Sequence, residues 1–322
     1  MRVLLWHVHG SWTTAFVQGR HTYLVPVLPD RGPDGVGRAR SWNWPQSVVE
    51  ITPEQLRDEQ VDLVVLQRPR EIELVQRWLG RKPGSGIPAV YLEHNTPAEK
   101  PCRQRHVVAE RADIPLVHVT YFNELFWDNG RARTQVIEHG IVDPGARYTG
   151  EIGHGAVVVN EPGRRGRVVG ADLIPRFAEI GGVDVFGMQT KEFVSGFRSQ
   201  SMTAYQDLFS QDQMHDQLAR RRVYLHPVRW TSLGLSLLEA MQLAMPVVAL
   251  GTTEVCEAVP TGAGRVSTDI GQLLRAYRTF LHEPEAARAA GLLARAAALD
   301  RYGLARFLQD WDRLMSCTFG DG

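Results

Sequence analysis

The sequence predicts an α/β protein made of two doubly wound domains that face each other across a cleft. Its length of 322 residues is more than a single domain of ordinary size needs. Short apolar runs alternate with longer helical patterns, which is typical of a doubly wound fold. The apolar runs are nearly continuous, as in parallel strands that are covered on both faces. A Gly-rich stretch near the middle separates two such series.

Nine apolar runs are predicted to be strands. The first five are Val3–Val8, Leu63–Gln67, Ala89–Glu93, Leu116–Thr120 and Gln135–Glu138. The second series comprises Ala156–Asn160, Val183–Gly187, Val223–His226 and Val247–Leu250. Between the strands, helical patterns occur at Arg70–Leu79, Tyr121–Asp128, Ala171–Ile180 and Leu235–Leu243. Residues 28–48 form a long loop rich in Gly, Pro and Arg, which is either a surface loop or a lid.

The stretch "VDPGARYTGEIGHG" at 142–155 reads as a linker, because it is rich in Gly and has no helix or strand periodicity. We therefore expect an N-terminal domain over residues 1–148 and a C-terminal domain over 149–302. An Ala-rich helix follows at 285–299, where Arg288 and Arg295 are expected on a solvated face.

Charge and cysteine content exclude several classes of protein. Lys and Arg together number 36, as do Asp and Glu, so bulk charge gives no argument for nucleic-acid binding or a membrane surface. No signal-peptide pattern and no uninterrupted apolar span of about 18–20 residues is present. Cys102, Cys256 and Cys317 are scattered and indicate neither a zinc site nor a disulfide framework. We expect a cytoplasmic protein without a membrane span, and peripheral membrane contact stays open.

The apolar helix at 235–243 carries a single carboxylate, Glu239. The N–H groups at a helix start, together with the helix dipole, suit a diphosphate, and Gly234 lets a ligand approach the backbone. One turn inside the helix, Glu239 could accept hydrogen bonds from the vicinal hydroxyls of a ribose. These residues alone are equally compatible with a buried glutamate satisfied by backbone groups or an arginine.

The run "WTSLGLSLLEAMQLAMPVVALGTTE" at 230–254 resembles the C-terminal signature of GT-B glycosyltransferases, specifically the retaining family-4 type. The matching residues are Gly234, Glu239, Ala240, Met241, Pro246, Val247, Val248 and Ala249. The resemblance implies that Glu239 binds the ribose of the nucleotide. It also implies a donor-binding turn made of Thr231, Ser232, Leu233, Gly234 and Leu235. Thr231 stands where the family has its first glutamate, and its hydroxyl can still hydrogen-bond.

A second stretch, "VVVNEPGRRGRVVGADLI" at 157–174, resembles the first strand of the family's C-terminal domain and the loop after it. In the family an Arg and a Lys-Gly pair in that loop contact the diphosphate. Arg165 fits the Lys, and Asn160 stands at the Arg position. Since a guanidinium can grip phosphate bidentately, Arg165 is a reasonable replacement, and Arg164 keeps the loop cationic. A solvated basic loop is the alternative interpretation.

In the N-terminal half, "AVYLEHNTP" at 89–97 resembles the family's strand that ends in a histidine beside the transferred sugar. The matching residue is His94. A histidine at a strand end is more often structural, but the carboxyl end of a parallel strand is where α/β sites lie. Weaker matches on the acceptor side are Gly10, Ser11 and His139. The last helix, within 303–322, resembles the segment that packs back onto the N-terminal domain.

The sequence thus predicts an enzyme that moves a sugar from a nucleoside-diphosphate sugar to a small-molecule or glycan acceptor, with retention. His94, Arg165 and Glu239 are its predicted catalytic residues. We expect no cofactor and no metal, because the only Asp-x-Asp, Asp310 to Asp312, lies on an amphipathic C-terminal helix. A sugar-nucleotide 2-epimerase of the same architecture and a non-catalytic nucleotide-sugar-binding protein are the alternatives.

Overall fold

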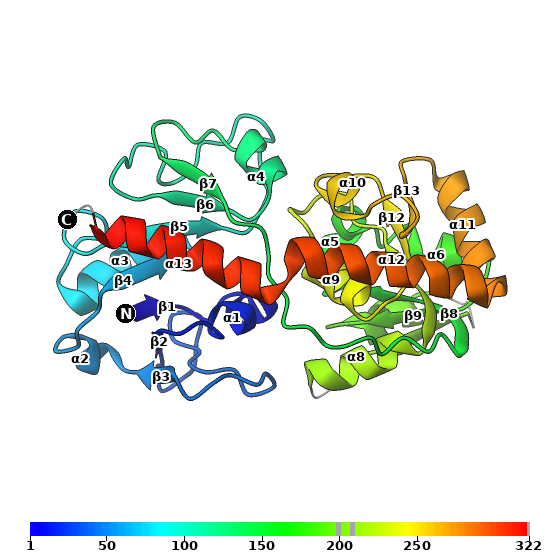
Figure 1. The fold of residues 1–322 in the computed structure, drawn as a ribbon, viewed down its shortest axis with the longest axis horizontal. Coiled ribbons are helices and arrows are strands. Elements are labelled where there is room, and N and C mark those ends of the chain that lie inside the picture. Colours follow the sequence, from blue (N-terminus) through cyan, green and yellow to red (C-terminus); the bar gives the residue numbers. More distant parts are fainter. Residues whose placement is uncertain (198–200, 207–209, 321–322) are drawn as a thin grey trace. The chain divides into compact units, whose positions relative to one another are not determined.

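The computed structural model describes residues 1–197, 201–206 and 210–320. The chain divides into two compact units (Figure 1). Unit 1 comprises Met1–Val142 and Leu304–Gly322, and unit 2 comprises Asp143–Gly303. The sequence-based boundaries lay at 148/149 and 302/303.

Unit 1 contains a seven-stranded parallel sheet in the order β3-β2-β1-β4-β5-β6-β7. Its strands are β1 (Arg2–Leu5), β2 (Thr22–Pro26), β3 (Val48–Ile51), β4 (Leu63–Leu66), β5 (Ala89–Glu93), β6 (Leu116–His118) and β7 (Thr134–Val136). Its helices are α1 (Gly10–Phe16), α2 (Pro53–Leu56), α3 (Pro69–Leu79), α4 (Tyr121–Phe126) and α13 (Leu304–Gly320). Strands β2 and β3 were not predicted.

Unit 2 contains a six-stranded parallel sheet in the order β10-β9-β8-β11-β12-β13. Its strands are β8 (Ile152–Val158), β9 (Val183–Phe186), β10 (Met202–Tyr205), β11 (Arg221–His226), β12 (Val247–Leu250) and β13 (Gly264–Ser267). Its helices are α5 (Pro162–Arg165), the 3-10 helix η1 (Gly166–Val169), α6 (Ile174–Ala178), α7 (Thr190–Ser195), α8 (Gln211–Ala219), α9 (Leu235–Gln242), α10 (Val255–Ala258), α11 (Ile270–His282) and α12 (Pro284–Tyr302).

Two expectations in unit 2 need correction. Strand β8 begins at Ile152, inside the stretch read as a linker, because its first residues pair with β11 despite their glycines. The helix expected over Ala171–Ile180 begins only at Ile174, where Pro175 occupies the first turn. Proline suits that position because it lacks the N–H that a first turn leaves unpaired.

Helix α13 completes an aromatic core in unit 1. The Trp311 ring lies 5.0 Å from the Phe16 ring and 5.6 Å from the Trp12 ring, measured between centroids. Phe307 packs directly against Gly140, where a β-carbon would collide with the Phe307 side chain. The last helix of the chain thereby covers α1, near the first strand of the sheet.

Arg288 and Arg295 of α12, which were expected on one solvated face, have different surroundings. Nη1 and Nη2 of Arg295 donate to the Asp143 carboxylate over 2.8 and 2.7 Å, and Nη1 also donates to the carbonyl of Gln242. Its side chain is only 18% exposed. Arg288 lies over the ring of Tyr148. The expectation of a solvated side chain was therefore wrong for Arg295, whose partners are distant in the sequence, whereas Arg288 is exposed as expected.

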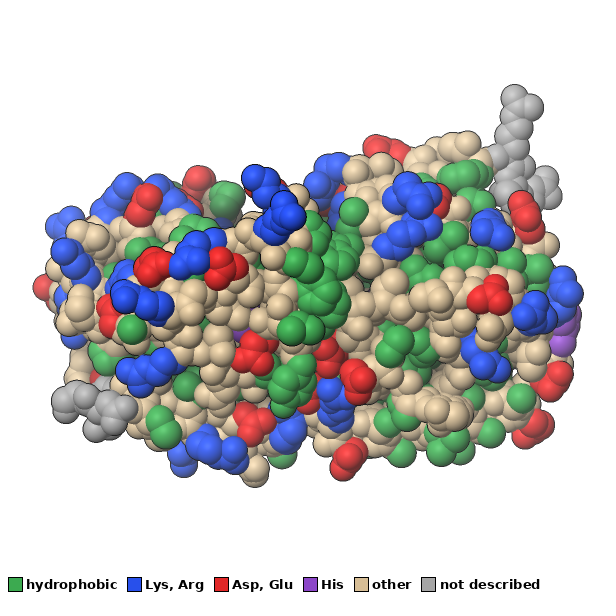
Figure 2. All heavy atoms as spheres, turned by 90° about the horizontal axis from the view of Figure 1, so that it is seen from above, with side chains coloured by type: hydrophobic (Ala, Val, Ile, Leu, Met, Phe, Trp, Pro, Cys, Tyr) green, Lys and Arg blue, Asp and Glu red, His purple; other side chains and the backbone are tan. Residues whose placement is uncertain are grey.

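The surface shows no dominant charge on the face in Figure 2, where Lys or Arg and Asp or Glu side chains are mixed over both units. Within the described residues, no helix has the length and apolar character that crossing a bilayer requires. Cys102, Cys256 and Cys317 are free thiols.

Candidate active site

The loop after β8 and the turn before α9 are joined by direct contacts. The backbone N–H groups of Arg229 and Trp230 both donate to the carbonyl of Val168, at 2.9 and 3.3 Å. Gly170 has φ +72°, and a β-carbon there would collide with the carbonyl oxygen of Pro227. The structure therefore brings together two of the segments that the sequence assigned to donor binding.

The three arginines of the first segment have different surroundings. Nε of Arg164 donates to Oε1 of Glu161 over 3.0 Å, and Arg167 pairs with Asp172, also at 3.0 Å. Arg165 is half-buried and forms no ion pair with a described residue. Burial, and then the neighbouring charge of Arg164, lowers the pKa of Arg165, which as a guanidinium remains charged. Arg165 is therefore the cation of this loop best placed to pair with an anionic ligand.

The start of α9 leaves its backbone without a side-chain cap, because the N-cap residue is Gly234. A β-carbon at Gly234 would come within 2.6 Å of Cε1 of His226, the last residue of β11. The Tyr224 hydroxyl donates to Oγ of Ser236 over 2.9 Å, which anchors the first turn of α9 to β11. In the predicted donor-binding turn, Ser232 and Leu233 are buried. Thr231 and Leu235 are half-buried.

Glu239 is 2% exposed and contacts α8 through both of its oxygens. Oε1 accepts a hydrogen bond from Nε2 of Gln211 over 2.7 Å, and Oε2 lies 3.2 Å from Nε2 of His215. The sequence reasoning missed both partners, because it did not predict α8. Their spacing of four residues, which puts them on one helix face, was the available signal.

Asn160 has a structural contact that the resemblance did not suggest. Its Oδ1 accepts a hydrogen bond from the N–H of Met188 over 3.0 Å, which ties the loop after β8 to the loop after β9. The amide side chain thus links two strand ends.

In unit 1, His94 lies just beyond the end of β5 and is 6% exposed. Its Nε2 lies 2.9 Å from Oε1 of Gln67, and its ring centroid is 4.1 Å from that of His9. Trp12 meets the His94 ring edge-on at 5.2 Å. Burial, and then the neighbouring charges of His9 and His139, holds the pKa of His94 well below its usual 6.5. His94 is therefore a neutral, tightly held imidazole.

His139 belongs to the same group of buried histidines. Neither ring nitrogen has a hydrogen-bond partner among the described residues. Burial, and then the charges of His9 and Arg306, lowers the pKa of His139 to about 3. The sequence reasoning missed His9, which directly precedes α1 and whose pKa is lowered to about 4, mainly by burial. Its place just after the first strand was the available signal.

The other acceptor-side predictions lie at the start of α1. Gly10 is the first residue of this helix, and a β-carbon there would come within 2.8 Å of the Trp42 ring. Ser11 follows and is half-buried. Unit 1 thus holds the predicted residues Gly10, Ser11, His94 and His139, while the donor-side residues all belong to unit 2.

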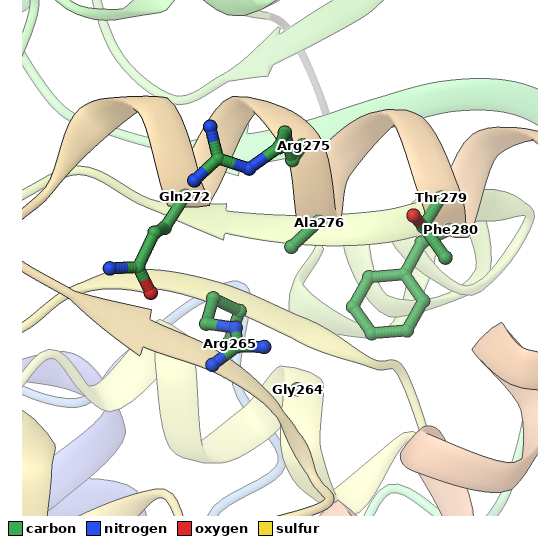
Figure 3. Close-up of a pocket in the computed structure, with 7 residues that line it drawn as sticks. All are labelled: Gly264, Arg265, Gln272, Arg275, Ala276, Thr279 and Phe280. Atoms are coloured by element: carbon green, nitrogen blue, oxygen red, sulfur yellow. The ribbon is translucent and has the colours of Figure 1, made fainter.

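The structure also has a hollow in unit 2 and two paired acidic residues on α13. A hollow of about 350 Å³ lies between β13 and α11 (Figure 3), and its lining includes Arg265, Gln272 and Arg275 but no predicted site residue. On α13, Asp310 pairs with Arg306, and Asp312 pairs with His21. Within the described ranges, no group of three or more His, Cys, Asp or Glu side chains is arranged to hold a metal ion.

The two parallel sheets and their connecting helices define the GT-B fold. Sucrose-phosphate synthase from Thermosynechococcus elongatus superposes with a TM-score of 0.72 at 14% identity, covering 100% of both chains. A glycosyltransferase from Rickettsia africae gives 0.70 at 10% identity, covering 100% of this chain and 99% of that one. Anabaena HepE in complex with UDP gives 0.68 at 13% identity, covering 98% and 99%.

Residues 186–283 match the family model described as Glycosyl transferases group 1, and this segment includes Gly234 and Glu239. A search of curated protein sequences finds no match. The predicted fold class, the resemblance to GT-B glycosyltransferases and the assignment as a glycosyltransferase are confirmed.

Proposed function

We propose that this protein transfers a sugar from a nucleoside-diphosphate sugar to an acceptor hydroxyl, with retention, as in the family-4 type, and without a metal ion. The observation that carries the proposal is the contact between the Arg165 loop and the turn before α9. An uncapped helix start and a guanidinium that has no carboxylate partner among the described residues together suit a diphosphate. The ion pairs of Asp310 and Asp312 support metal independence, because they occupy the only Asp-x-Asp.

Each of the three predicted catalytic residues, His94, Arg165 and Glu239, has a role in this reaction. Arg165 and the amides of Leu233, Gly234 and Leu235 stabilise the diphosphate as the bond from C1 of the sugar to the phosphate oxygen breaks. Glu239 accepts hydrogen bonds from the ribose, and His94 binds a sugar hydroxyl. The acceptor oxygen bonds to C1 from the same face, and its proton passes to the departing phosphate oxygen.

The partners follow from this chemistry: a nucleotide sugar and a small molecule or glycan that offers a hydroxyl. Anabaena HepE has been solved with UDP and with UDP-glucose, so uridine diphosphate is the first nucleotide to test. We expect the protein in the cytoplasm, where free thiols such as Cys102 and Cys256 stay reduced.

Nucleotide binding tests the donor site. The melting temperature is measured with UDP, GDP, ADP and TDP; a true ligand at 100 times its dissociation constant stabilises the fold by about 2.7 kcal/mol. We expect Arg165→Ala to abolish the shift. Arg167→Ala is the matched control, because Arg167 is paired with Asp172 and we expect it to keep the shift. A flat response of the native protein to all four nucleotides contradicts the proposal.

Product masses test the reaction. With donor and acceptor present, we expect free nucleoside diphosphate and an acceptor heavier by one sugar residue. A sugar nucleotide of unchanged mass but altered sugar would instead identify an epimerase. Binding without any turnover would identify a non-catalytic protein, and either result contradicts the proposed transfer.

A further inference from the structure

The Gln67 side chain links the ends of two neighbouring strands in unit 1. Gln67 directly follows β4, and its Nε2 donates to the carbonyl oxygen of Trp6, just beyond β1, over 2.8 Å. A backbone carbonyl can only accept a hydrogen bond, so the nitrogen of the amide must face Trp6. The oxygen, Oε1, therefore faces the opposite direction.

That oxygen determines which nitrogen of His94 carries the proton. Oε1 of Gln67 lies 2.9 Å from Nε2 of His94. An amide oxygen can only accept, so Nε2 must be the protonated nitrogen. Burial keeps the ring neutral by holding the pKa of His94 far below 6.5. Nδ1 is then unprotonated and carries a lone pair.

Gln67 is itself held in place by α3. Its backbone N–H donates to Oε2 of Glu71 over 2.6 Å, and Nε of Arg68 donates to Oε1 over 2.7 Å. Glu71 is fully buried, and Gln67 is 5% exposed. With both its backbone and its amide engaged, Gln67 is a rigid partner for the imidazole.

We propose that Gln67 is a positioning residue that fixes His94 as its Nε2-protonated tautomer, so that His94 presents Nδ1 as a hydrogen-bond acceptor. This rests on the proposed function and refines it. The group that His94 binds is a hydroxyl, which can donate to Nδ1. An anionic oxygen is disfavoured there, because two acceptors facing each other repel.

The tautomer of His94 can be measured in the native protein without any substrate. In ¹⁵N-histidine-labelled protein, long-range ¹H–¹⁵N correlations identify which ring nitrogen carries the proton, and the signals of His94 are those lost in His94→Gln. We expect a proton on Nε2 from about pH 6 to about pH 8. A proton on Nδ1, or a doubly protonated ring, overturns the proposal.

Two substitutions test the role of Gln67. Gln67→Met removes the acceptor, so we expect a mixture of tautomers and a kcat that is lower by about tenfold or more, with the dissociation constant for UDP unchanged. In Gln67→Glu the carboxylate stabilises the protonated ring, so the rate should fall as the pH is lowered towards about 6. Gln76→Met, at an exposed position on α3, should change neither property.

The results separate this proposal from the proposed function. A His94 tautomer that is unchanged in Gln67→Met overturns the role of Gln67, as does an altered tautomer with an unaltered kcat. If Gln67→Met does not fold, the spectrum of the native protein still decides the tautomer. Failure of the native protein to bind any nucleotide would contradict the proposed function and leave the tautomer measurement valid.

Discussion

The ring of His226 lies against Gly234 so closely that a β-carbon at position 234 would come within 2.6 Å of Cε1. Gly234→Ala must therefore move the start of α9 away from the end of β11, or displace the ring. We expect a loss of about 1–3 kcal/mol in unfolding free energy. We also expect nucleotide binding that is weaker by about tenfold or more.

Urea unfolding and titration calorimetry measure these two effects. Gly163→Ala is the matched control, because a β-carbon there meets nothing within 4 Å. Unaltered nucleotide binding in Gly234→Ala would show that the start of α9 does not contact the diphosphate.

Glu239 is predicted to recognise the ribose and not the diphosphate. Glu239→Ala should weaken UDP binding by about tenfold or more, because a hydrogen bond to a charged group contributes about 1.5–3 kcal/mol. Inorganic pyrophosphate should bind Glu239→Ala as it binds the native protein, whereas Arg165→Ala should lose both ligands. Titration calorimetry separates these cases, with the exposed Glu257→Ala as control. Equal losses for UDP and pyrophosphate in Glu239→Ala would contradict a ribose contact.

Two histidines of unit 1, buried His139 and half-buried His9, predict a loss of stability in acid. Folding lowers the pKa of His139 from 6.5 to about 3, and that of His9 to about 4. Between about pH 6.5 and about pH 4 the unfolded chain binds protons that the folded chain does not. The free energy of unfolding therefore falls as the pH falls through this window, and these groups contribute no pH dependence above it.

Replacing one of these histidines should flatten that dependence. We expect His139→Asn to reduce the slope by about one proton, or about 1.4 kcal/mol per pH unit. Urea unfolding at a series of pH values measures the slope, and His282→Asn, at an exposed position, is the control. A slope identical to that of the native protein would show that His139 is protonated in the folded state.

Trp311 should be a main source of stability in unit 1, because its ring packs against those of Trp12 and Phe16. We expect Trp311→Ala to lower the free energy of unfolding by about 3–5 kcal/mol. Leu299→Ala is the control, since Leu299 is 37% exposed and should cost much less. Denaturant unfolding followed by circular dichroism measures both, and a loss under about 1 kcal/mol for Trp311→Ala would contradict this role.

The strands that could be predicted from the sequence and those that could not differ in burial. All nine predicted strands are present, several within a residue or two of their predicted ends. Three of the four missed strands, β3, β10 and β13, are at sheet edges. An edge strand is covered less, so its residues need not be apolar; β13, for example, reads Gly-Arg-Val-Ser. The fourth, β2, is buried but ends at Pro26, which reads as the start of a loop.

The candidate site also has features that could be predicted from the sequence and features that could not. Gly234 and Glu239 could be predicted because a helix start and a carboxylate one turn later lie within a single stretch of sequence. Their contacts with His226, Gln211 and His215 could not be predicted, because those residues belong to other strands and helices.

By itself the sequence determined the fold class, the glycosyltransferase resemblance and the segments that carry it, because local apolar pattern and turn chemistry are written in consecutive residues. Only the tertiary structure decided that Arg165, unlike Arg164 and Arg167, pairs with no carboxylate in the described part of the chain. It alone decided that Gln67 faces His94. These properties depend on which strand ends lie next to each other. The order of strands in each sheet decides this, and it brings together residues that are far apart in the chain.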